Sequence, residues 1–224
     1  MANKTCVTLA ESNPAKLRSR LRIALKRSDY AELRFDFMDP IKIPVVLNLV
    51  KKDLKRCICT LRPKSEGGKF SANEKNRISI LKLIAEYEPY LLDVEFNTIR
   101  KNKDIRQYLK RTKTNLLVSW HDFKKTPDEN LLKKKLKLMS KFSNNIKIVT
   151  TAKTIGDAMK VLLLYRNLPK NHSLIAFAMG DSGRMSRILC TQFGSPYTYV
   201  SLGKPVAPGQ FSLDEVKSIF KLKK

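Results

Sequence analysis

Short apolar runs alternate with longer segments in which apolar residues recur every three or four positions, from one end of the chain to the other. The short runs are typical of buried strands, and the three- and four-residue spacing indicates amphipathic helices. This alternation predicts an α/β protein with a parallel sheet. Eight strands are expected, near Thr5–Leu9, Ala31–Asp36, Cys57–Leu61, Leu91–Phe96, Leu116–Trp120, Ile146–Thr150, Leu174–Met179 and Tyr197–Leu202.

Capping residues indicate where several of the intervening helices begin. A hydroxyl side chain followed three residues later by glutamate forms a capping box, and proline is favoured in the first helical turn. Pro14, Pro44 and Pro127 suit such first-turn positions, and the box spacing occurs at Ser71–Glu74, Thr126–Glu129 and Ser212–Glu215.

The number of strand and helix units decides between two architectures. Eight units within 224 residues match a small (β/α)8 barrel, whose active sites lie at the carboxyl ends of the strands. An open doubly wound sheet would require a glycine-rich phosphate loop after an early strand, and neither Gly-x-Gly-x-x-Gly nor a Walker loop occurs. No linker rich in Gly, Ser or Pro divides the chain. We therefore predict an α/β fold in which residues 1–224 form a single TIM barrel.

A net charge of +25 suggests a protein that binds nucleic acid through lysine and arginine. The charges are spread over the whole chain, and within the predicted helices they alternate with apolar residues at helical spacing. This arrangement indicates solvated outer faces rather than one binding surface. Because no RNP-like aromatic strand or zinc finger accompanies the charge, we expect no dedicated nucleic-acid partner. A basic nucleic-acid-binding module stays the alternative from composition alone.

The four cysteines give no indication of a metal site. They form no Cys-x-x-Cys pair of the kind that binds a structural zinc. We expect buried, reduced thiols and no bound metal.

No apolar run approaches the twenty residues of a membrane span, and the polar residues before the first strand do not form a signal peptide. A soluble, cytoplasmic protein that does not bind a membrane is expected.

Charged residues end the second predicted strand. Strand alternation places Glu32, Arg34 and Asp36 on one face. If this face points into a barrel, the three charges require partners or a ligand. An internal ion pair without a functional role is the alternative interpretation.

The next two strands also carry polar residues near their ends. Asp93 and Glu95 share a face and need a nearby cation, for which Lys147 is one candidate. Arg62 begins a loop that contains Gly67 and Gly68, which permit a close approach to a ligand, although a solvated turn explains them equally.

Lys147 and His121 are the strongest candidates for chemistry. His121 ends the fifth predicted strand, where an imidazole can take and return a proton near neutral pH. Lys147 lies between Ile146 and Ile148 in the sixth, and an apolar setting favours the neutral amine, a nucleophile toward carbonyl carbon. The alternative is a lysine at a sheet edge whose ammonium reaches water. We predict a Schiff base lysine beside a histidine.

In this order, the motifs resemble the type I 3-dehydroquinate dehydratase family over nearly the whole chain. The matching stretches are Glu32-x-Arg34-x-Asp36, Arg62 with Glu66-Gly67-Gly68, Asp93-Val94-Glu95, Ser119-Trp120-His121-Asp122-Phe123, Thr126-Pro127, Lys147-Ile148, Met179-Gly180-x-x-Gly183-x-x-Ser186-Arg187, Phe193-Gly194-Ser195 and Ala207-Pro208-Gly209-Gln210.

The resemblance implies a lyase that converts 3-dehydroquinate to 3-dehydroshikimate and water in the shikimate pathway, without a cofactor. It implies that Lys147 forms an iminium with the C3 ketone and that His121 removes the C2 proton and protonates the departing C1 hydroxyl, with Glu66 assisting. A homodimer is also implied. The expected substrate-binding residues are Arg187 and Gln210 for the carboxylate, and Glu32, Arg34 and Arg62 for the ring hydroxyls.

The chain departs from the family at two positions near these residues. Trp120 replaces the usual Asn, Tyr or His and could alter the packing of His121, and Val206 replaces a serine that contacts the substrate in many members. A class I aldolase, which also forms an iminium on a barrel lysine, is the alternative enzyme, but it requires a phosphate site after the seventh and eighth strands.

Overall fold

The computed structural model describes residues 3–222, and it divides the chain into two compact units. One unit is Thr8–Leu117, and the other combines Met1–Val7 with Val118–Lys224. The eight strands of the described residues form one sheet in the order β7-β6-β5-β4-β3-β2-β1-β8. The single domain expected for residues 1–224 stays a prediction, and its first two and last two residues lie outside the described part of the chain.

Every predicted strand is present, with bounds within two residues of those expected. The predicted strand Ala31–Asp36 ends early because Phe35–Phe37 forms a 3-10 turn that contains Asp36. The observed strands are β1 Thr5–Leu9, β2 Tyr30–Arg34, β3 Cys57–Thr60, β4 Leu91–Glu95, β5 Leu116–His121, β6 Asn145–Thr151, β7 Ser173–Met179 and β8 Thr198–Ser201.

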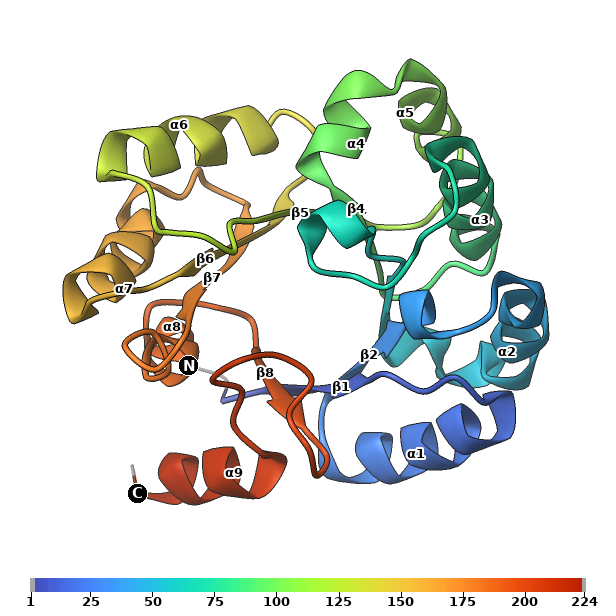
Figure 1. Ribbon diagram of the computed structural model, residues 1–224, viewed down its shortest axis with the longest axis horizontal. Helices are drawn as coiled ribbons and strands as arrows, with labels where there is room; N and C mark the ends of the chain where they lie inside the picture. Colours follow the sequence, from blue (N-terminus) through green and yellow to red (C-terminus); the bar gives the residue numbers. More distant parts are fainter. Residues whose placement is uncertain (1–2, 223–224) are drawn as a thin grey trace. The chain divides into compact units, whose positions relative to one another are not determined.

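Helices follow the strands as the alternating pattern predicted (Figure 1). They are α1 Pro14–Arg27, α2 Ile43–Leu49, α3 Glu74–Glu86, α4 Phe96–Lys101, α5 Lys103–Leu109, α6 Glu129–Met139, α7 Ile155–Leu162, α8 Ser186–Gln192 and α9 Leu213–Lys221.

Only one of the three expected capping boxes forms. Ser212 and Glu215 make both reciprocal hydrogen bonds at the start of α9. The boxes predicted at Ser71–Glu74 and Thr126–Glu129 are wrong, because Asn73 caps α3 and Asp128 caps α6. Each of these side chains lies directly before its helix and accepts from an N–H of the first turn, which leaves no role for the earlier hydroxyl. Pro14 and Pro44 occupy first-turn positions, as predicted, whereas the prediction for Pro127 is wrong because this residue precedes Asp128, the cap of α6.

In the unit of residues 8–117, strand register places polar side chains at the carboxyl ends of three strands. Strands β2, β3 and β4 pair in parallel. Arg34 is opposite Thr60, and Thr60 is opposite Asp93. Helix α1 lies along β2, and α3 lies beside α5 and β4 (Figure 1).

In the other unit, β6 and β7 pair in parallel over seven residues, with Lys147 opposite Ile175. Helix α7 lies beside both of these strands (Figure 1). The parallel pairing brings the ends of the two strands together, where Thr151 is opposite Met179.

The four cysteines are buried and form no disulfide within residues 3–222, in agreement with the expected buried thiols. None of the helices within residues 3–222 has the length and apolar character that a membrane span requires.

Candidate active site

Glu32 and Arg34 at the end of β2 are held by neighbours within residues 8–117. The Glu32 carboxylate accepts hydrogen bonds from the hydroxyls of Thr8, at 3.2 Å, and Thr60, at 3.0 Å. The Arg34 guanidinium donates to both carboxylate oxygens of Asp36, each at 2.8 Å. The internal ion pair considered as an alternative therefore exists. Asp36 belongs to the turn after the strand, and it also accepts from the Lys69 N–H.

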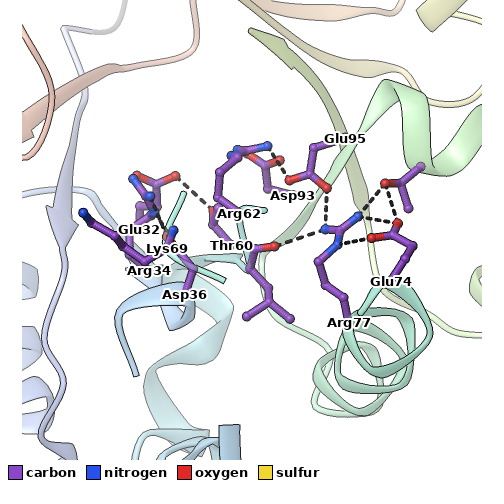
Figure 2. A network of polar contacts seen from close by, with 12 residues as sticks. Glu32, Arg34, Asp36, Thr60, Arg62, Lys69, Glu74, Arg77, Asp93 and Glu95 are labelled. Carbon is purple, nitrogen blue, oxygen red and sulfur yellow. Dashed lines mark hydrogen bonds and ion pairs between the residues drawn. The ribbon is translucent and has the colours of Figure 1, made fainter. Parts of the chain in front are cut away.

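Arg62 supplies the cation that Asp93 and Glu95 require, a partner that the sequence analysis did not assign to them. Its guanidinium donates to Asp93 at 2.6 Å and to Glu95 at 2.7 Å, and all three side chains are buried (Figure 2). Burial acts to lower the pKa of Arg62, but the two carboxylates outweigh it and raise that pKa above its ordinary value. Arg62 therefore stays charged and fixed between two acids.

Arg77 is the residue of this network that sequence reasoning missed. It is only 1% exposed although it belongs to helix α3. Its guanidinium donates to Glu95 at 2.5 Å, to the Leu61 carbonyl at 3.1 Å and to both oxygens of Glu74 (Figure 2). A signal was present, because Arg77 precedes Leu81 by four positions and thus lies on the buried face of the helix.

Glu66 ends a short 3-10 turn in the loop after β3, and only 8% of it is exposed. Burial raises the pKa of Glu66 to about 7, although Arg62 opposes the shift. Gly67 has φ 74°, and a Cβ on Gly68 would lie 1.9 Å from the Arg62 carbonyl oxygen. The two glycines therefore allow the loop to close on Arg62, which the solvated-turn alternative does not explain.

Lys147 is buried within β6, with 6% of its surface exposed. Its strand pairs with β7 on one side, and on the other the Asp122 N–H donates to the Val149 carbonyl at 2.9 Å. The alternative of an edge strand is therefore excluded. The Lys147 Nζ lies 4.2 Å from the centre of the Tyr199 ring. An ammonium above an aromatic face is attracted by the ring, which orients this side chain.

His121 is the last residue of β5 and is partly exposed. The hydrogen bond from Asp122 to Val149 sets this strand end against the part of β6 just beyond Lys147. Trp120 does not disturb this arrangement, because successive strand residues point to opposite faces and the Trp120 indole lies 4.5 Å from the Lys135 ammonium.

Arg187 is a buried cation that lacks an acidic partner among residues 3–222. Only 2% of it is exposed, and one guanidinium nitrogen donates to the Pro208 carbonyl at 2.9 Å. Its Nε has no hydrogen-bond partner in the described chain. Burial lowers the pKa of Arg187 to about 10. A carboxylate ligand would satisfy both the charge and the open donor.

Gln210 ends the loop that follows β8 and is buried. Its side-chain carbonyl accepts from the Val206 N–H at 2.9 Å, which folds the loop on itself. This contact uses the backbone of Val206, so the loss of a serine there does not remove it. Gly209, at φ 69°, lets the loop approach Gly180.

Phe177 and Tyr199 connect Lys147 with Arg187, and the sequence analysis assigned neither ring a role. The ring centres are 6.4 Å apart, and the Arg187 guanidinium lies 4.4 Å from the centre of Phe177. Lys147 contacts the other ring of the pair. The two cations therefore lie on adjacent aromatic residues of β7 and β8.

The chain is similar to known proteins over most of its length. The family model of type I 3-dehydroquinase matches residues 5–224. The 3-dehydroquinate dehydratase of Dehalococcoides mccartyi strain 195 is 36% identical over 204 residues, which are 88% of this chain and 89% of the relative.

Solved structures resemble the whole chain. The 3-dehydroquinate dehydratase of Aquifex aeolicus VF5 has 27% identity and a TM-score of 0.81, and the match covers 98% of each chain. That of Geobacillus kaustophilus HTA426 has 22% identity and a TM-score of 0.88, with 99% of this chain and 91% of that chain covered. This likeness confirms the (β/α)8 TIM-barrel fold. The chain belongs to the type I 3-dehydroquinase family.

Proposed function

We propose that Lys147 and His121 dehydrate 3-dehydroquinate to 3-dehydroshikimate, the hydro-lyase reaction of the type I family to which the chain belongs. The observation that carries this proposal is the buried lysine on a central strand, beside the strand end that bears His121. Membership of the type I 3-dehydroquinase family supports this reaction rather than that of a class I aldolase.

In the proposed reaction, the Lys147 amine attacks the C3 carbonyl carbon, and loss of water gives an iminium. The iminium withdraws electrons from the adjacent C2–H bond, so His121 can remove that proton and leave an enamine. The C1–O bond then breaks as His121 returns a proton to the departing hydroxyl. Water finally releases 3-dehydroshikimate and restores the amine.

Arg187 and Gln210 are proposed to hold the substrate carboxylate. A planar guanidinium can donate two parallel hydrogen bonds to a carboxylate, and the buried Arg187 has an open donor for this purpose. Glu66 is proposed to assist His121, and Glu32, Arg34 and Arg62 to hold the ring hydroxyls. The protein is also proposed to form a homodimer and to be located in the cytoplasm.

Trapping with borohydride tests the proposal directly. The protein is incubated with 3-dehydroquinate and borohydride, and the modified peptide is identified by mass spectrometry. We expect a reduced, ligand-sized adduct on the Lys147 peptide. The exposed Lys153, six residues further along, provides a matched control. Lys153→Ala should keep the adduct, whereas Lys147→Ala should lose both the adduct and the formation of 3-dehydroshikimate. A folded wild-type protein that forms neither adduct nor product would overturn the proposal.

A further inference from the structure

Five charged side chains form a continuous network of ion pairs in the unit of residues 8–117 (Figure 2). Glu74 pairs with Arg77, Arg77 with Glu95, Glu95 with Arg62, and Arg62 with Asp93, with contacts of 2.5 to 2.8 Å. Glu74 forms the outer end of the network, because half of its side chain is exposed. The other four members are buried.

Arg77 contacts the surroundings of Arg62 in two ways. One of its nitrogens donates to the backbone carbonyl of Leu61, the residue directly before Arg62. The same nitrogen donates to one oxygen of Glu95, while the other oxygen of Glu95 accepts from Arg62. Arg77 therefore fixes both the backbone next to Arg62 and the carboxylate that orients the Arg62 guanidinium.

We propose that Arg77 is a positioning residue, which sets the orientation of Arg62 through Glu95 and thereby determines the affinity for the hydroxylated ring of the substrate. This inference rests on the proposed function, in which Arg62 binds the ring hydroxyls. A guanidinium held between two carboxylates has a fixed plane, and hydrogen bonds to hydroxyl groups depend on that plane.

The charges of the network support this role. Glu66, Asp93 and Glu95 are three buried acids, and Arg62 alone cannot balance them. Burial raises the pKa of Glu95, whereas Arg62 and Arg77 both oppose that shift. Loss of Arg77 would therefore favour a protonated Glu95. A protonated carboxyl accepts a guanidinium hydrogen bond less strongly, so Arg62 would lose one of its two fixed partners.

A purely structural role is the competing explanation, because Arg77 also donates to the Thr98 hydroxyl and thus joins α3 to α4. A structural residue and a positioning residue differ in their kinetic effects. Misplacement of Arg62 would weaken substrate binding while leaving iminium formation on a saturated enzyme unchanged. General loosening of the unit would lower stability without this selective loss.

The test compares Arg77→Met with Glu74→Gln, a change at the exposed end of the same network. We expect Arg77→Met to raise KM for 3-dehydroquinate about tenfold or more, with kcat within about threefold of the wild type. Borohydride adduct formation at saturating substrate should be unchanged. Glu74→Gln should leave KM within about twofold, because Arg77 keeps its contacts to Glu95 and Leu61.

A second background separates the two roles. When Arg62→Met already removes the guanidinium of Arg62, adding Arg77→Met should change KM less than about twofold. The reason is that Arg77 is proposed to act on KM only through that guanidinium. An equal rise of KM in both backgrounds would overturn the inference, and so would a wild-type KM in Arg77→Met. If Arg62→Met itself leaves KM unchanged, the role of Arg62 in the proposed function fails instead. If Arg77→Met does not fold, Glu95→Gln tests the middle of the network with the same expected rise in KM.

Discussion

The Lys147 ammonium lies 4.2 Å above the centre of the Tyr199 ring, so a residue of β8 orients the amine on β6. Tyr199 in turn contacts Phe177, against which the Arg187 guanidinium packs. The two aromatic rings thus set the positions of the proposed nucleophile and of the proposed carboxylate-binding residue together.

Tyr199→Leu is expected to slow iminium formation because it removes the ring that orients Lys147. Without the ring the amine is no longer held in one position, and misplacement of a reacting group costs up to about 10²-fold, so the rate of borohydride trapping should fall roughly ten- to a hundredfold. Tyr199→Phe keeps the ring and should stay within about twofold of the wild type. A larger defect in Tyr199→Phe than in Tyr199→Leu would show that the hydroxyl, and not the ring, matters.

His121→Gln is expected to separate iminium formation from dehydration. The proposed general acid–base is lost while the Lys147 amine stays in place, so kcat should fall about 10²- to 10⁴-fold. Borohydride should still trap the substrate on Lys147, because the change leaves the amine intact. A variant that dehydrates 3-dehydroquinate at nearly the wild-type rate would exclude His121 as the general base.

Arg187→Met is expected to improve stability at the expense of binding. Burial lowers the pKa of Arg187 to about 10, so its charge destabilises the folded state at neutral pH, and no acid among residues 3–222 compensates. Replacement by methionine should raise the free energy of unfolding by about 1 to 3 kcal/mol, as measured in urea. KM for 3-dehydroquinate should rise about a hundredfold or more because a buried charge pair with the substrate is lost. Marked destabilisation would contradict the interpretation of an unpaired buried cation.

Glu66 is expected to make stability depend on pH. Burial raises its pKa to about 7 from the ordinary value of 4.5, with Arg62 opposing. Between these two pH values the folded protein keeps a proton that the unfolded chain has released, so the free energy of unfolding falls as the pH rises and becomes level above pH 7. Between pH 4.5 and pH 7, the free energy of unfolding of the wild type should fall by about 3 kcal/mol relative to that of Glu66→Gln.

Glu215→Gln provides a control of opposite sign for the Glu66 measurement. Hydrogen bonds from the backbone and side chain of Ser212 hold the pKa of Glu215 below its ordinary value. The contribution of the Glu215 carboxylate to the free energy of unfolding is therefore present above pH 4.5 and is lost as the pH falls through the lowered pKa. The stability of the wild type relative to Glu215→Gln should increase with pH. In urea unfolding, a fall with pH relative to both variants would contradict the assignment of Glu215, and a rise relative to both would contradict that of Glu66.

The strands were predictable from the sequence because each short apolar run is buried on a parallel sheet, and Lys147 was conspicuous because it interrupts such a run. The contacts of Tyr199 and Phe177 were not predictable, since aromatic residues in apolar strands look the same whether or not a cation lies on the ring. The caps of α3 and α6 were mistaken because Ser71 and Thr126 have the right spacing, while Asn73 and Asp128 are directly adjacent to the helices. Local spacing cannot rank two competing caps.

Gly68→Ala is expected to disturb Arg62 through the loop that closes on it. A Cβ at Gly68 would lie 1.9 Å from the Arg62 carbonyl oxygen, a backbone atom that cannot move aside without shifting β3 and its loop. Such overpacking should lower the free energy of unfolding by about 1 to 3 kcal/mol, and KM should rise because the Arg62 guanidinium moves with its backbone. Gly156→Ala is the matched control. Gly156 lies in the first turn of helix α7, and its Cβ would meet only the hydroxyl of the capping residue Thr154, at 3.6 Å. That change should raise stability by about 0.5 to 1 kcal/mol and leave KM unchanged. Urea unfolding and steady-state kinetics on both variants provide the comparison, and a Gly68→Ala protein with wild-type KM would show that the loop does not position Arg62.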